Sequence, residues 1–149
     1  MYLYKKKALM IYLILINATV FIILSFLHIY WALGGNWGMN AVLPTIIHNQ
    51  KTIRPGFFMT MAVAVAMGAC ALIIIGNMGI FGDYLTHHFF KYSTIVIAVI
   101  FSLRAMGDFR YVGFFKKATG TLFAKNDTRY YSPLCVLIAV LSLAIALLN

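Results

Sequence analysis

The strongest constraint on the fold of this chain is segment 8–33, which contains no Lys, Arg, Asp or Glu over 26 residues. A helix rises about 1.5 Å per residue, so about 20 apolar residues cross the ~30 Å hydrocarbon core of a bilayer. A basic triplet at 5–7 precedes the segment, as in a secretory signal, but the apolar region of such a signal runs only about 7 to 15 residues. We therefore expect a retained transmembrane helix.

Composition extends this prediction to the whole chain. Apolar residues make up 63% of the sequence and charged residues only 10%, a balance that cannot give a soluble core its polar surface. Three further uncharged stretches follow the first. They predict an all-α integral membrane protein, with four transmembrane helices in a compact bundle that forms one domain over residues 1–149. The approximate spans are 8–33, 56–81, 88–110 and 131–148.

The net charge of +9 comes from twelve Lys and Arg against three acids, Asp83, Asp108 and Asp127. Basic residues beside apolar spans set topology and contact anionic lipid, and no basic run accompanies a recognition helix. We therefore expect the lipid bilayer as a partner and no nucleic acid. The sequence names no protein partner.

The second span is rich in small residues, among them Ala64, Gly68 and Ala71, and several lie four apart, as Ala64 and Gly68 do. Such spacing lets helix backbones approach closely in a bilayer. It favours close packing inside the bundle over dimerisation.

The third span is short, because only Tyr92 to Leu103 separates Lys91 from Arg104. Twelve residues reach about 18 Å, less than the core thickness, so a charge must enter the membrane zone. One possibility is a helix that continues beyond Arg104 and holds Asp108 and Tyr111 on the same face. The other is a helix that ends near Leu103 and leaves the later charges in water.

The histidines give weak evidence for a metal. His87 and His88 are adjacent and point to different sides of a helix, while Asp83, His87 and Lys91 share a face that an interfacial position explains. We predict no metal site. No cofactor can be identified, although a single haem ligand is compatible with the residues.

Four crossings place the distinctive polar and aromatic residues on one membrane face, since the first loop, the third loop and the adjoining helix ends all meet there. The opposite face carries the Lys triplet, Asp83, the His pair and Lys91. The candidate ligand-binding residues on the distinctive face are His28, Tyr30, Trp31, Trp37, Arg104, Asp108, Arg110, Tyr111, Asp127, Arg129 and Tyr130.

Three hypotheses of function follow. A binding or transport module would hold a lipid-like or anionic amphipathic small molecule, since the distinctive face carries eight basic residues against two acids. The positive-inside rule explains the same charges without a ligand. A membrane-embedded enzyme would use His28 with Asp108 or Asp127 on a lipophilic substrate, although no spacing supports a catalytic set. A structural or partner-binding subunit would use these residues only to lock helix ends.

Two pairings are expected on this face. His28 should lie inside the bundle and bond with another element, at Asp108, Asp127 or a nearby Tyr. Asp108 should pair with Arg104 or Arg129, because an unpaired carboxylate at that depth costs several kcal/mol.

Three blocks of sequence carry a resemblance. They are HIYWALGG at 28–35, FRYVGFFK at 109–116 and DTRYYSP at 127–133. Together they resemble the bacterial integral-membrane family catalogued as domain of unknown function 3995. The resemblance covers nearly the whole chain and implies a four-helix, multi-pass protein of the bacterial inner or plasma membrane. It implies no activity.

Overall fold

The computed structural model describes residues 2–43, 45–46, 51–52, 55–81, 86–107, 112–116 and 121–149. Long helices dominate these residues, and four helical segments are long and apolar enough to cross a membrane. The helices are α1 (Tyr2–Ala32), α2 (Met39–Val42), α3 (Phe57–Gly76), α4 (His87–Met106), α5 (Leu122–Asn126) and α6 (Ser132–Leu148), with a π-helical turn, η1 (Asp127–Tyr131), joining the last two. This architecture confirms the predicted all-α membrane fold.

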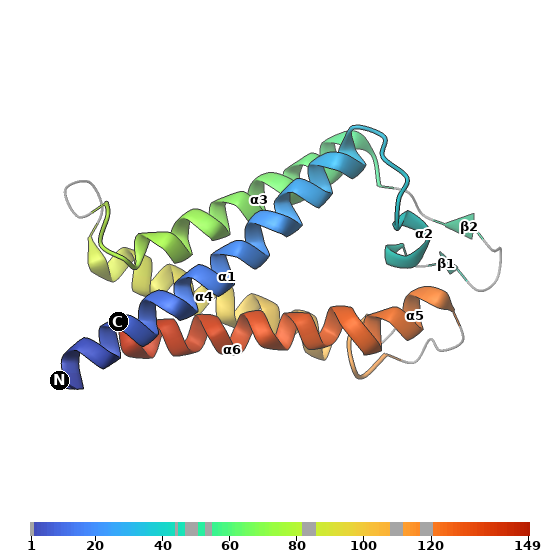
Figure 1. Cartoon of the computed structure of the whole chain (residues 1–149). Helices are drawn as coiled ribbons and strands as arrows, with labels where there is room; N and C mark the ends of the chain where they lie inside the picture. The colour runs from blue at the N-terminus through green and yellow to red at the C-terminus, as the bar shows by residue number, and fades with distance from the viewer. Residues whose placement is uncertain are drawn as a thin grey trace.

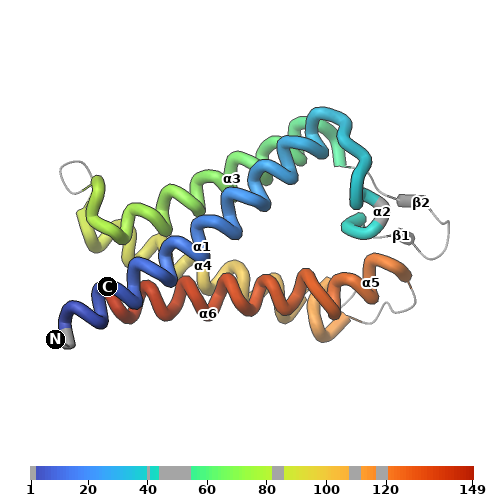
Figure 2. Tube along the Cα trace, in the orientation of Figure 1, coloured from blue at the N-terminus to red at the C-terminus, as the bar shows by residue number. Residues whose placement is uncertain are grey.

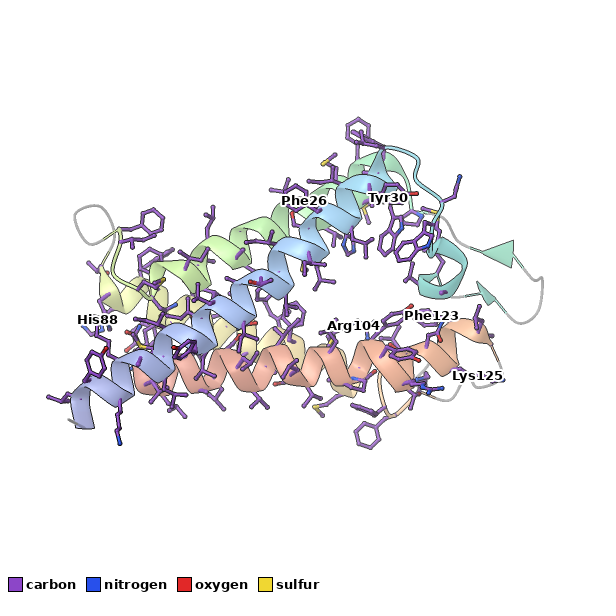
Figure 3. The ribbon with its side chains drawn as sticks, viewed as in Figure 1. Phe26, Tyr30, His88, Arg104, Phe123 and Lys125 are labelled. Carbon is purple, nitrogen blue, oxygen red and sulfur yellow. The ribbon has the colours of Figure 1, made fainter. Side chains whose placement is uncertain are left out.

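The four long helices alternate in direction. Both termini lie at one end of the molecule, here called the terminal end, and α2 and α5 lie at the other, here called the loop end (Figure 1). Between α1 and α3 the chain also forms a minimal antiparallel pair of strands, β1 (Thr45–Ile46) and β2 (Lys51–Thr52). His88 lies at the terminal end and Lys125 at the loop end, as the predicted topology requires (Figure 3).

α1 packs closely on α3 through the small residues of the second span. The hydroxyl of Ser25 donates to the carbonyl of Ala64 at 2.8 Å, and a methyl group on Gly68 would lie 3.5 Å from the same hydroxyl. Ala64 and Ala71 are buried. Small residues four apart therefore serve packing inside the bundle, as predicted.

The long helices form two pairs, α1 with α3 and α4 with α6. Side-chain hydrogen bonds join these pairs toward the terminal end. Asn17 of α1 donates to the hydroxyl of Ser142 of α6 at 2.9 Å, and both side chains are fully buried. Asn77 donates to the hydroxyl of Thr94 at 2.8 Å and accepts from the amide of Asn149 at 2.7 Å. These bonds hold α3, α4 and the end of α6 together, where few polar alternatives exist.

Toward the loop end the two pairs diverge, with α1 beside α3 and α4 beside α6 (Figures 1 and 2). Burial follows the same division. No residue of α1 beyond Phe21 is fully buried, whereas Phe101 and Ala105 of α4 and Ser132 of α6 remain buried. The loop-end third of α1 thus leaves the common core and keeps only α3 as a long-helix neighbour.

Three helix ends differ from the approximate spans of the sequence analysis. The first helix begins at Tyr2, so it includes the Lys triplet that precedes the predicted span 8–33. The third helix ends at Met106, because Gly107 follows with a φ of 91°. Of the two possibilities for this span, the helix that ends near Leu103 is therefore the one observed. Helical structure in the last span begins at Leu122, before the predicted start at 131.

The π-helical turn has a local cause in the sequence. Pro133 has no backbone N–H, and its ring would clash with a carbonyl one helical turn before it. The chain relaxes into a wider turn here, in which the N–H of Ser132 donates to the carbonyl of Asp127. π-turns of this kind often occur at functional sites, and this one begins with a buried acid.

Candidate functional site

Asp127 is the centre of a charged cluster at the loop end. Its carboxylate is fully buried and receives groups from two other segments of the chain. One oxygen, Oδ2, accepts from Nζ of Lys116 at 3.0 Å and from the backbone N–H of Gly113 at 2.7 Å. The other, Oδ1, lies 3.4 Å and 3.5 Å from the two terminal nitrogens of Arg104. We call these four residues the Asp127 cluster.

The position of Gly113 depends on a tight crossing with Gly107. Both glycines have positive φ, at 86° and 91°, and a side chain on either one would collide with the other's backbone or its neighbours. The N–H of Phe114 donates to the carbonyl of Ala105 at 3.0 Å and closes the segment between them. Only glycine permits this approach, which brings the N–H of Gly113 to Asp127.

Lys116 lies closer to Asp127 than Arg104 does, and its side chain is more deeply buried. Its side chain is 4% exposed, and its ammonium also donates to the carbonyl of Gly113 at 3.0 Å and the hydroxyl of Thr128 at 2.6 Å. Arg104 is 38% exposed and makes only long contacts with Asp127. Since one lysine already neutralises the carboxylate, the cluster carries a surplus positive charge on a half-exposed guanidinium.

The first of the three sequence blocks, HIYWALGG at 28–35, forms a second cluster together with Trp37. The imidazole of His28 packs edge-on against Trp31, with ring centroids 5.1 Å apart, and Nδ1 lies 2.7 Å from the carbonyl of Leu24. The indole of Trp31 donates to the carbonyl of Trp37 at 2.9 Å, and the hydroxyl of Tyr30 accepts from the N–H of Trp37 at 3.4 Å. The block therefore folds residues 33–37 back over the end of α1.

A half-open pocket of about 240 Å³ lies beside this block, between the loop ends of α1 and α3. We call it the His28 pocket. Its lining is mainly apolar and consists of His28, Trp31, Met39, Val42, Leu43, Pro55, Met59, Thr60 and Val63.

Helix α2 connects the two clusters. It forms part of the pocket wall and packs on α5, which leads directly into Asp127. The hydroxyl of Tyr131 donates to the carbonyl of Ala41 in α2 at 3.2 Å. Tyr30 lies on the α1 side of the diverging helices, whereas Arg104 and Phe123 lie on the α4 and α6 side (Figure 3).

The structure thus divides the candidate site residues into groups. His28, Tyr30, Trp31 and Trp37 form one cluster, and Arg104 and Asp127 form the other. Arg129 and Tyr130 are exposed and pair with each other, the guanidinium carbon 5.4 Å from the ring centroid. Asp108, Arg110 and Tyr111 lie outside the described residues, and so does the predicted pairing of Asp108.

Two expectations about these residues need correction or addition. The recorded hydrogen bond of His28 goes to its own helix, whereas a partner on another element had been predicted. Arg104 pairs with Asp127. Sequence reasoning missed Lys116, Gly107 and Gly113, although Gly113 and Lys116 belong to the second block and Gly107 lies just before it. Among the described residues no three His, Cys, Asp or Glu side chains gather in a way that could hold a metal.

The fold and this charged, aromatic end define a multi-pass, four-helix membrane protein. The family described as Protein of unknown function (DUF3995) matches residues 21–142, so the chain belongs to that family. Comparisons with curated proteins and with solved structures give no match.

Proposed function

We propose that this membrane protein binds an anionic amphiphile at its loop end, with the acidic group at Arg104 and the apolar part in the bilayer. The observation that carries the proposal is the surplus charge of the Asp127 cluster. Lys116 and Gly113 satisfy one carboxylate oxygen at short distances, and Arg104 approaches the other at 3.4 Å while 38% exposed.

Arginine suits this role because its planar guanidinium presents five donors and can bind a phosphate or carboxylate through two of them. Arg104 lies two positions before the end of a membrane-spanning helix, near the depth of lipid head groups. The bacterial cell membrane, which the family resemblance implies, contains anionic phospholipids that carry such a phosphate.

The proposal is tested by native mass spectrometry of the purified protein in mild detergent. The probes are phosphatidylglycerol and phosphatidylcholine with identical acyl chains. We expect preferential retention of phosphatidylglycerol, and about a tenfold loss of that affinity in Arg104→Gln, since one charge-assisted hydrogen bond contributes about 1.5 kcal/mol or more.

Lys91→Gln is the matched control, because it removes one positive charge from the same helix at the terminal end. Its expected loss is less than about twofold, as for an isolated surface charge. Equal losses in the two variants would show a general response to net charge. That result, or equal retention of both lipids by the unmodified protein, would refute a site at Arg104.

A further inference from the structure

We infer that the His28 pocket binds an uncharged lipophilic molecule through a hydroxyl group that donates a hydrogen bond to Nε2 of His28. This site is separate from Arg104, which is not among the pocket residues. The inference therefore stands or falls independently of the proposed function.

The first step is the state of the imidazole. Nδ1 lies 2.7 Å from the carbonyl oxygen of Leu24, which can only accept, so Nδ1 carries the hydrogen. In the neutral ring Nε2 is then an acceptor. Within the part of the chain that the structure describes, Nε2 has no hydrogen-bond partner.

The second step is the rest of the pocket wall. The indole N–H of Trp31 is committed to the carbonyl of Trp37 at 2.9 Å, and the hydroxyl of Thr60 to the carbonyl of Gly56 at 3.1 Å. The other lining residues are apolar. With these two hydrogens already used, the polar side-chain atoms that remain in the described wall, Nε2 of His28 and the hydroxyl oxygen of Thr60, can only accept. Such a wall is the complement of a molecule with one donor.

The third step concerns charge. None of the lining residues that the structure describes is Lys, Arg, Asp or Glu. An ionised group would leave water here without an opposite charge, at a cost that a neutral hydroxyl avoids. A long-chain alcohol, or a neutral lipid with one free hydroxyl, matches this chemistry.

Trp31 provides the readout, since it lines the pocket and the chain contains only two tryptophans. In a Trp37→Phe background Trp31 is the sole indole, and the backbone of residue 37 keeps its bonds to Trp31 and Tyr30. A brominated ligand in contact with the ring quenches its fluorescence. The probes are 11-bromo-1-undecanol, its methyl ether and 11-bromoundecanoic acid.

We expect saturable quenching by the alcohol at a concentration about threefold to tenfold lower than for the ether, as for one neutral hydrogen bond. His28→Phe should abolish this difference, and His87→Phe, at the terminal end, should preserve it. Val63→Phe keeps the imidazole but fills the pocket, so it should remove quenching by both probes.

Equal quenching by alcohol and ether in the Trp37→Phe protein would overturn the inference, as would a difference that survives in His28→Phe. If 11-bromoundecanoic acid quenches most strongly, the inference that the ligand is uncharged is overturned. Absence of saturable quenching would overturn the site itself. If His28→Phe does not fold, the comparison of alcohol with ether and the Val63→Phe variant still decide the question.

Discussion

At the scale of single residues, Asp127 and Lys116 form a buried ion pair, with Nζ of the lysine 3.0 Å from Oδ2 of the aspartate. Their side chains are 0% and 4% exposed, so neither charge can be solvated if the other is removed. A buried ion pair contributes little net stability, but breaking it leaves an uncompensated charge. The carboxylate also fixes the N–H of Gly113, so it links η1 to the segment after α4.

Asp127→Asn should therefore lower the free energy of unfolding by about 3 to 5 kcal/mol, the usual cost of stranding a buried partner. Arg104→Gln should cost only about 0 to 1 kcal/mol, because that contact is long and half exposed. Thermal unfolding in detergent measures both. The double variant Asp127→Asn/Lys116→Met should recover part of the loss, and purely additive losses would contradict a buried pair.

The choice of Lys116 could not have been predicted from the sequence. Lys116 and Lys117 are adjacent in a basic loop and look alike, and Lys116 does not share a helix with Asp127, so no periodicity selects it as the partner. The partner is set by the crossing of Gly107 and Gly113, which is a tertiary contact. The composition of the loop indicated charge, whereas the glycine crossing decides which charge is buried.

At the scale of elements, the Gly107 and Gly113 crossing ends α4 and presents the second block to Asp127. Gly113→Ala should be strongly destabilising, because it combines a positive φ with a collision against the backbone of Gly107 and Met106. Gly79→Ala is the matched control, since Gly79 has a φ of 81° but open space around a methyl group.

Gly79→Ala should cost about 1 to 2 kcal/mol, the conformational term alone. Gly113→Ala should cost at least about 2 kcal/mol more, in line with other forced overpacking. Thermal unfolding of the two variants side by side measures the difference. Equal losses would mean that the crossing opens without cost.

Helix α2 is the second element on which the loop end depends, because four residues cannot hold a helix in water by themselves. Its carbonyl at Ala41 accepts from Tyr131. Tyr131→Phe should increase amide hydrogen exchange in 39–42 by about fivefold, as expected for the loss of about 1 kcal/mol. Tyr130→Phe, at the exposed neighbouring position, should leave that exchange unchanged, and a similar increase there would contradict the docking role of Tyr131.

Most of the helices were predictable because a bilayer demands about 20 apolar residues per crossing, and the four stretches satisfy that demand. Their ends were not predictable in the same way. Gly107 stops α4 through its φ, and helical structure in the last span begins at Leu122, before the predicted start at 131. Hydropathy records the apolar core of a span, whereas caps and tertiary contacts decide where its helix ends.

The common face of the candidate site was predicted for the same reason, since alternating helices bring those ends together. Its division into two clusters was not. His28 and Arg104 belong to different helix pairs, and these pairs diverge toward the loop end (Figure 2). Sequence spacing along one helix carries no information about the angle between two pairs.

At the scale of the whole molecule, the two ends differ in how closely the helix pairs are held together. Hydrogen bonds join the pairs at the terminal end, and the pairs diverge toward the loop end. Two hydrogen bonds tie the helix pairs together within the bundle and near the terminal end, from Asn17 to Ser142 and from Asn77 to Thr94. At the loop end the short helix α2 connects them, since it packs on α5 and accepts a hydrogen bond from Tyr131 of η1. Ligands are therefore expected at the loop end, where helix surfaces are less completely covered.

The arrangement predicts the sidedness of each chain segment in the membrane. In a variant without Cys70 and Cys135, single cysteines at 37 and 125 should react from one side, and cysteines at 87 and 149 from the other. The reason is that α2 and α5 share the loop end, whereas the start of α4 lies with both termini (Figure 1). A membrane-impermeant maleimide applied to intact cells and to inverted vesicles measures each position.

The same labelling resolves two opposing charge arguments about orientation. The Lys triplet at 5–7 favours cytoplasmic termini, because the first helix usually dominates, whereas the larger number of basic residues near the loop end favours a cytoplasmic loop end. In either orientation positions 37 and 125 must agree with each other and disagree with 87 and 149. Reaction of 37 and 125 from opposite sides would contradict four crossings, and with them the meeting of the first and third blocks through α2 and Tyr131.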